Sequence, residues 1–210
     1  MRSVRLALAN GALLTLMLGH FTNDMLGGTL PLLLPEMKER FGLSNAAVGL
    51  VPLAYTGMAS LTQPLFGFFS DRYGRRWFAS AALLWGASFV ALYGFAPSYP
   101  IFLAFAALAG VASGAYHPLG ASNAALVSDD RYKNVAMSLY TVGGTSGFAL
   151  GPLVAVGLLA LFGMRGTVLL LAPAIAVATL LLTQMGRVER ARRARLAANA
   201  GEAEGRPAWG

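Results

Sequence analysis

Two histidines and one carboxylate stand out in this chain, because ionisable side chains are rare within its long apolar segments. His20 and Asp24 lie four residues apart in the first of these segments. In a helix this spacing places both side chains on one face. An imidazole and a carboxylate one turn apart can exchange a proton near neutral pH, which suits proton-coupled transport. The alternative is that the two side chains only satisfy each other's hydrogen bonds.

The rest of that helical face is polar or small, and a second histidine lies in a later segment. Asn23, Gly27, Gly28 and Pro31 follow His20 at helical spacing, and Asp24 is the sole carboxylate inside any apolar segment. His117 directly precedes Pro118, so it is either a pathway residue or the donor of an interhelical hydrogen bond. We predict that the proton-coupling group consists of Asp24, His20 and His117.

Neutral polar side chains indicate where a substrate could be held by hydrogen bonds. Thr56, Ser60 and Gln63 recur at helical spacing in the second apolar segment, with Tyr55 beside them. Thr56 and Ser60 can instead bond back to carbonyls of their own helix. The predicted substrate-binding residues are Asn23, Tyr55, Gln63 and Ser113.

Glycines at four-residue intervals predict close contacts between helices. The small-xxx-small pattern lets two helix backbones approach inside a membrane. It occurs twice in the chain, and in the second case a proline follows the last glycine. The predicted helix-packing residues are Gly110, Gly114, Gly143, Gly147, Gly151 and Pro152.

The composition indicates which elements must position these residues. The 210-residue chain is 56% hydrophobic and only 12% charged, whereas soluble domains carry roughly 25% charged residues. A membrane span needs about 20 mostly apolar residues. Six such runs predict an all-α membrane protein with six transmembrane helices near residues 10–34, 45–69, 77–96, 99–127, 135–162 and 166–185.

The distribution of basic residues predicts the orientation. With the N-terminus inside, thirteen of the sixteen Lys and Arg residues fall on the inner side, as the positive-inside rule requires. We therefore expect a cytoplasmic N-terminus (1–9), a six-helix bundle (10–185) and a basic, disordered cytoplasmic tail (186–210). The net charge of +7 then belongs to membrane-protein loops, and no nucleic-acid partner is expected.

Several kinds of chemistry are not expected. Zero cysteines exclude a disulfide framework and a thiolate metal site, and two histidines cannot form a histidine-rich metal site. The chain also shows no nucleophile–base pair and no nucleotide-binding loop. We expect no metal site, no cofactor and no enzymatic activity.

The turn between the second and third apolar segments carries a specific motif. Its residues Gly67, Asp71, Arg72, Gly74, Arg75 and Arg76 match the pattern G-x-x-x-D-R-x-G-R-R. The pattern resembles the signature between the second and third spans of the major facilitator superfamily. The resemblance implies one six-helix half of that fold, built as 3+3 inverted repeats, and a gating role for the motif together with Asp129 and Asp130.

Further pieces of the sequence resemble the fosmidomycin-resistance branch of that superfamily. The members of this branch are bacterial drug-efflux proteins. They are His20-Phe21-Thr22-Asn23-Asp24, Gln63-Pro64 before Gly67, Ser113 through Pro118, and Val142-Gly143-Gly144. Gly147-x-x-x-Gly151-Pro152 resembles the superfamily's antiporter motif, but Val154 and Ala155 replace its later glycines. The resemblance implies proton-driven efflux of a small drug-like or polar compound across the bacterial inner membrane, with both termini cytoplasmic.

Superfamily members have twelve spans, so a second six-helix half is an expected partner, besides the substrate, protons and the lipid bilayer. The chain can pair with a second copy of itself or with a separately encoded C-terminal half. Alternatively, it is a non-transporting fragment or assembly subunit of a split or disrupted transporter.

Overall fold

The structure of the chain, a computed structural model, describes residues 2–73 and 77–204, and within these ranges every regular element is a helix. The expected all-α fold class is therefore confirmed. In chain order the elements are α1 (Arg2–Leu8), α2 (Gly11–Phe41), α3 (Asn45–Tyr73), α4 (Phe78–Ala91) with the 3₁₀ helix η1 (Leu92–Phe95), α5 (Tyr99–Leu126), α6 (Lys133–Phe162), the 3₁₀ helix η2 (Gly163–Leu170) and α7 (Leu171–Glu204).

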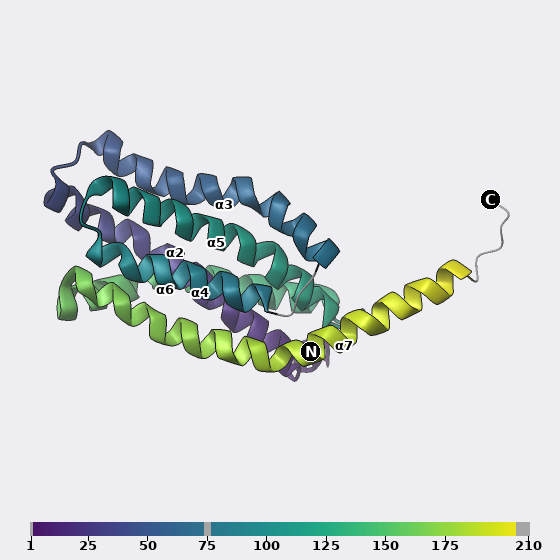
Figure 1. The fold of residues 1–210 in the computed structure, drawn as a ribbon. Coiled ribbons are helices and arrows are strands. Elements are labelled where there is room, and N and C mark those ends of the chain that lie inside the picture. The colour runs from purple at the N-terminus through teal and green to yellow at the C-terminus, as the bar shows by residue number, and fades with distance from the viewer. Residues whose placement is uncertain (1, 74–76, 205–210) are drawn as a thin grey trace.

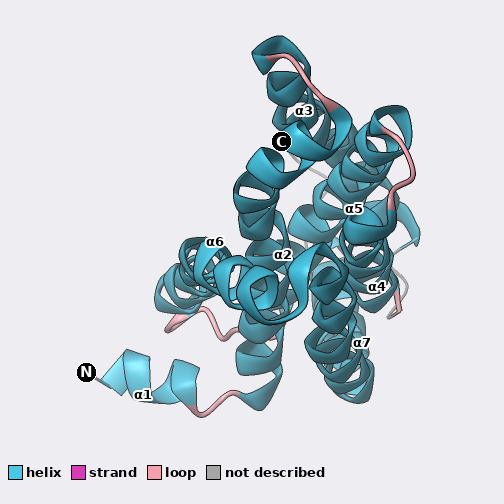
Figure 2. Cartoon of the chain, turned by 90° about the vertical axis from the view of Figure 1, so that its left-hand side faces the viewer, coloured by secondary structure: helices cyan, strands magenta, loops and turns pink. Residues whose placement is uncertain are grey.

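The six long helices α2 to α7 run side by side as a bundle (Figure 1). Seen along the bundle, α2 lies near the centre, with α6 on one side and α5 on the other (Figure 2). The short helix α1 lies outside the bundle, at 75° to α2. The central place of α2 brings the polar face predicted from its sequence into contact with neighbouring helices.

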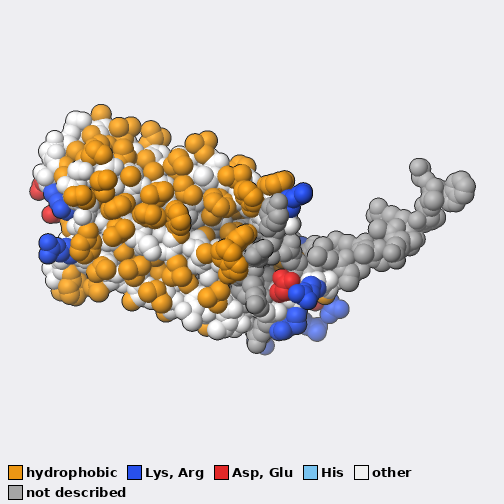
Figure 3. Space-filling view, viewed as in Figure 1, with side chains coloured by type: hydrophobic (Ala, Val, Ile, Leu, Met, Phe, Trp, Pro, Cys, Tyr) orange, Lys and Arg blue, Asp and Glu red, His pale blue; other side chains and the backbone are white. Residues whose placement is uncertain are grey.

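The surface is typical of a membrane protein. Apolar side chains cover the middle of the visible face, and charged side chains gather at its two ends (Figure 3). By length and hydropathy alone three segments of the described chain qualify as spans: Phe78–Phe95, Tyr99–Leu126 and the 52-residue stretch Lys133–Gln184. That stretch contains α6 and much of α7, and the bent pair α1–α2 adds a fourth candidate.

Two element boundaries differ from the sequence-based expectation. The connection between the expected spans 10–34 and 45–69 is helical as far as Phe41, because α2 ends at a left-handed Gly42 (φ 62°) whose N–H bonds to Glu39 O. Such a glycine satisfies the last carbonyls of a helix.

The tail also differs from the expectation, because α7 continues as a helix to Glu204 and projects away from the bundle (Figure 1). Alanine, arginine and glutamate favour helix, and Arg193 Nε lies 3.0 Å from Glu189 Oε1 one turn away. Residues 205–210 lie outside the described part of the chain.

Glycines bring α2 and α6 into backbone contact. A Cβ added at Gly147 would meet the carbonyl oxygen of Phe21, and one at Gly151 would lie 2.6 Å from Met25 O. From the other side, a Cβ at Gly28 would lie 2.5 Å from Phe148 O. No larger residue fits such distances, so the sequence at these positions sets the spacing of the two helices.

A second close pair forms between α3 and α5. Here the glycines stand on α5: a Cβ at Gly110 would meet the carbonyl oxygen of Tyr55, and one at Gly114 would meet that of Ala59. The two pairs together hold α2 and α5 against their neighbours, and the candidate site lies where these two helices meet.

Candidate functional site

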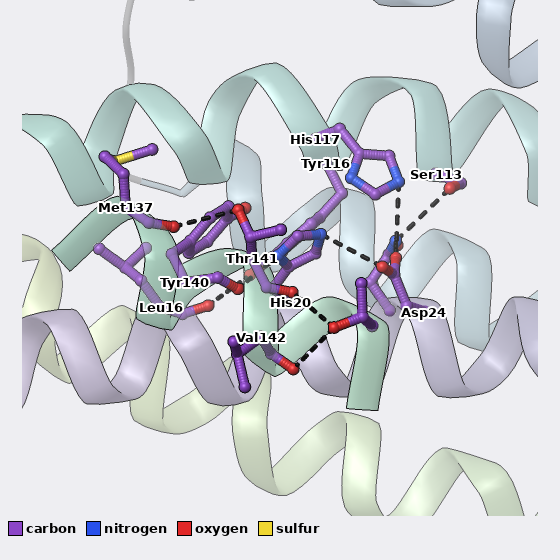
Figure 4. A network of polar contacts seen from close by, with 12 residues as sticks. Leu16, His20, Asp24, Ser113, Tyr116, His117, Met137, Tyr140, Thr141 and Val142 are labelled. Carbon is purple, nitrogen blue, oxygen red and sulfur yellow. Dashed lines mark hydrogen bonds and ion pairs between the residues drawn. The ribbon is translucent and has the colours of Figure 1, made fainter. Parts of the chain in front are cut away.

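The site centres on the carboxylate of Asp24, which lies between two imidazoles (Figure 4). His20 Nε2 lies 3.2 Å from Asp24 Oδ2 on the same helix, α2. His117 Nε2, from α5, lies 3.5 Å from Asp24 Oδ1. Each carboxylate oxygen therefore faces its own imidazole, and the three residues that the sequence analysis grouped lie together.

The contact of His20 with α6 determines which of its ring nitrogens carries a proton. His20 Nδ1 lies 2.9 Å from the carbonyl oxygen of Tyr140. A carbonyl oxygen only accepts hydrogen bonds, so Nδ1 is the donor. Nε2 is then left to face Asp24 Oδ2 at 3.2 Å. At this distance Nε2 can accept a hydrogen bond from a protonated carboxyl group or, in an imidazolium, donate one to a carboxylate.

The three side chains differ in their access to solvent. The side chain of His20 is 10% exposed and that of Asp24 18%, whereas that of His117 is 31% exposed. His20 also stacks on the Tyr140 ring at 4.2 Å between centroids and meets His117 edge-on at 5.1 Å. His117 is thus the member of the cluster that opens outward, and His20 is the member held in the interior.

Neutral polar residues extend the cluster toward α3. Asn23 Nδ2 donates to Asp24 Oδ1 at 2.9 Å and to Ser113 Oγ at 3.4 Å. The Tyr55 hydroxyl lies close to Gly27 of α2, where an added Cβ would be 2.6 Å away. Of the four predicted substrate-binding residues, Asn23 therefore contacts the carboxylate, Ser113 contacts Asn23, and Tyr55 packs against the same helix.

The fourth, Gln63, is exposed on α3 and takes no part in the hydrogen bonds described for the cluster. Thr56 Oγ1 donates to Pro52 O at 2.8 Å, so for this residue the alternative of bonding to its own helix is correct.

The gating motif is described only in part. Gly67 lies within α3, where an added Cβ would be 3.9 Å from Pro118, and Asp71 and Arg72 lie in the last turn of α3. The side chain of Asp71 and the whole of Gly74, Arg75 and Arg76 lie outside the described residues.

The two aspartates expected to meet the motif each contact a residue two or three positions further along the chain. Asp129 Oδ1 accepts a hydrogen bond from the backbone N–H of Arg131 at 2.9 Å. Asp130 lies 4.0 Å from Lys133 Nζ, and its side chain is 93% exposed.

The sequence analysis assigned no site role to Tyr140, and it named Gly144 only within the family resemblance. A Cβ at Gly144 would lie 2.5 Å from His20 Nε2 and 2.6 Å from Asp24 Oδ2, so only glycine leaves room for this pair. The available signal was the adjacency of Gly144 to the Gly143, Gly147, Gly151 series, which places it beside the face that contacts α2.

Comparison with known proteins identifies the family. The sequence model of the Major Facilitator Superfamily matches residues 16–209. The chain is 31% identical to the fosmidomycin resistance protein of Escherichia coli (strain K12) over 177 residues, which cover 84% of this chain and 43% of that protein. It is 34% identical to a probable 4-methylmuconolactone transporter of Cupriavidus pinatubonensis over 128 residues, 61% of this chain and 30% of that protein. The chain spans less than half the length of these relatives.

Solved structures show the same fold. A bacterial homolog of the human lysosomal transporter Spinster, in an inward-facing and occupied conformation, superposes with a TM-score of 0.72 at 20% identity, over 80% of this chain and 42% of that one. The xylose transporter XylE from E. coli, in an inward-open conformation, gives a TM-score of 0.69 at 18% identity, over 91% of this chain and 54% of that one.

Proposed function

Because the chain belongs to the major facilitator superfamily of membrane transporters, we propose that it is one half of a proton-coupled efflux transporter for a small drug-like or polar compound. The observation that carries this proposal is the carboxylate of Asp24 between two imidazoles inside the bundle. A charge placed there is costly, and in membrane proteins such groups mark ion and substrate pathways.

The geometry supports a proton as the coupling ion. A proton is proposed to be held between His20 and Asp24, which lie 3.2 Å apart, and His117 contacts the same carboxylate from the more exposed side of the cluster. A proton arriving at His117 can pass to Asp24 and then to His20 without a large movement of any helix. Release in the opposite order would return the cluster to its starting state.

Substrate recognition is proposed beside the coupling group. Asn23 donates to Asp24, and Ser113 and Tyr55 offer hydroxyl groups close to it on α5 and α3. A substrate that competes for the hydrogen bonds of Asn23 changes the surroundings of the carboxylate, and this couples substrate to proton. Gln63, exposed on α3, is the fourth residue proposed to bind substrate.

The chain needs a second wall for a central cavity. Superfamily transporters bind substrate between repeats that rock against each other, and this chain spans 43% of its fosmidomycin resistance relative. A second six-helix half, either another copy of this chain or a separate C-terminal half, completes the site. The competing proposal is that the chain is a fragment or assembly subunit that does not transport.

The motif at the end of α3 is proposed as a cytoplasmic gate. A carboxylate such as Asp71 can interact favourably with the positive end of a helix, which the second half would supply. Asp129 and Asp130 lie in the loop between α5 and α6, on the side of the bundle that we assign to the cytoplasm.

The test of coupling uses vesicles that contain this chain with whichever second half it requires. An imposed pH gradient should drive accumulation of a compound from a panel that includes fosmidomycin in the parent, and Asp24→Asn should lose at least about tenfold of the gradient-driven rate. Glu39→Gln removes an exposed carboxylate from the same helix and should transport normally. Full gradient-driven transport by Asp24→Asn would disprove the coupling role, and absence of transport in every assembly would favour the non-transporting alternative.

The proposed localisation is the bacterial inner membrane with both termini cytoplasmic. The chain has no cysteine, so Pro97→Cys and Asp130→Cys introduce single labelling sites in loops at opposite ends of the bundle. An impermeant maleimide added to intact cells should label the cysteine at position 97 and not that at position 130. The reverse pattern would show the opposite orientation.

A further inference from the structure

We propose that His20, Asp24 and His117 form a binding site for a divalent transition-metal ion, with Zn²⁺ as the preferred occupant. The sequence predicted no metal site, because the chain has no cysteine and only two histidines. The fold adds a carboxylate between the two histidines, which gives a set of two imidazoles and one carboxylate. Imidazole and carboxylate are ligands that Zn²⁺ prefers, and sites with three protein ligands keep a fourth position open.

The distances between the donor atoms fit a tetrahedral ion. Zn²⁺ binds nitrogen and oxygen at about 2.0–2.1 Å, so adjacent ligand atoms of a tetrahedron lie about 3.3–3.4 Å apart. His20 Nε2 lies 3.2 Å from Asp24 Oδ2, which is close to this length, whereas His117 Nε2 lies 3.5 Å from the other carboxylate oxygen, Oδ1. One donor atom from each of the three residues lies within 4.8 Å of the others. A rotation of the partly exposed His117 side chain brings its Nε2 closer to His20 Nε2 and Asp24 Oδ2, so that all three atoms can bind one ion.

The surrounding contacts orient the ligands in the way that metal sites require. A metal-binding histidine usually donates its other N–H to a carbonyl or carboxylate, which turns the free nitrogen toward the ion. His20 does this through Nδ1 and the carbonyl of Tyr140, at 2.9 Å. The carboxylate is likewise held, because Asn23 Nδ2 donates to Asp24 Oδ1 at 2.9 Å.

The α6 side and the His117 side of the cluster differ in the space they leave. Gly144 closes the α6 side, since an added Cβ would lie 2.5–2.6 Å from His20 and Asp24 atoms. The side chain of His117, 31% exposed, marks the open side. A water molecule entering there supplies the fourth ligand, and binding of the ion displaces the proton that His20 and Asp24 share. A Zn²⁺ ion at this position would therefore compete with the coupling proton.

The test measures binding and does not depend on transport. Tag-free full-length protein in detergent is titrated with Co²⁺, whose visible absorption reports tetrahedral coordination, and then with Zn²⁺ in competition. Because the chain has only two histidines, an imidazole-bound Co²⁺ spectrum can arise only from residues 20 and 117. We expect one ion per chain, displaced by Zn²⁺.

Variants distinguish the residues that bind the ion from the residue that orients them. Asn23→Ala removes the donor to Asp24 and Ser113 but no ligand, and should weaken Zn²⁺ binding by roughly 10- to 100-fold. His117→Gln removes a ligand and should weaken binding further. Glu189→Gln, in the projecting part of α7, should bind like the parent. An unchanged circular dichroism spectrum verifies the fold of each variant.

Two results would overturn the proposal: a parent protein without stoichiometric tetrahedral Co²⁺, or a folded His117→Gln protein with parental affinity. Neither result bears on proton coupling, which the Asp24→Asn transport assay tests separately.

Discussion

The bundle contains two close helix pairs, α2–α6 and α3–α5, and they achieve contact in different ways. In the inverted repeat of this fold α2 corresponds to α5, and α6 corresponds to α3. The first pair is spaced mainly by glycines of α6, among them Gly147 and Gly151, whereas the second is spaced by Gly110 and Gly114 of α5. The backbone approach is therefore common to both repeats, but the glycines stand on non-equivalent helices.

The two pairs also differ in what they hold. At the α2–α6 contact, His20 bonds to the Tyr140 carbonyl and Gly144 leaves room for the His20–Asp24 pair. At the α3–α5 contact, Tyr55 and Ser113 provide neutral polar groups. The two repeats thus supply two similar scaffolds, and Gly144 gives the first one room for the His20–Asp24 pair.

The largest expected change in the free energy of unfolding is at the α2–α6 contact. Gly147→Ala places a Cβ against the Phe21 carbonyl oxygen, where backbone must move, so we expect a loss of about 3 kcal/mol in unfolding free energy. Gly157→Ala on the same helix meets nothing within 4 Å and should stabilise by up to about 1 kcal/mol through helix propensity. Thermal unfolding in detergent, followed by tryptophan fluorescence, measures both, and equal melting temperatures would refute the backbone-contact argument.

A similar but smaller effect is expected at the second pair. Gly110→Ala places its Cβ against the Tyr55 carbonyl oxygen and should cost about 2 kcal/mol. Gly57→Ala, on α3 with nothing within 4 Å, serves as its control in the same unfolding assay. If Gly110→Ala is as stable as Gly57→Ala, the two pairs are not equivalent and the glycines of α5 have another role.

The smallest effect on stability is expected at Gly144. The atoms that an added Cβ meets there belong to the side chains of His20 and Asp24, which can move, so Gly144→Ala should cost less than about 1 kcal/mol. The same movement separates the pair that shares the proton, and gradient-driven transport should fall severalfold while the melting temperature changes little. Parental transport in this variant would show that the 3.2 Å contact is not needed for coupling.

Much of the fold could be predicted from the sequence because a bilayer leaves few choices. Backbone polar groups inside a membrane must be satisfied within helices or closed barrels, so long apolar runs separated by short turns predict the helices. The C-terminal ends of two helices were less predictable. α2 continues to its cap at Gly42, and helix-favouring residues extend α7 to Glu204. Local propensity decides such ends, and hydropathy does not report it.

The amino-acid sequence by itself determined the helical class, the superfamily motif and the shared face of His20 and Asp24, because each depends on residues close together in the chain. Only the tertiary structure decided that His117, 93 residues beyond Asp24, reaches its second oxygen, and that the Tyr140 carbonyl fixes the protonated nitrogen of His20. These contacts join three helices, and their distances depend on how closely glycines let the backbones approach. Helical periodicity defines the face of one helix, but packing selects which faces meet.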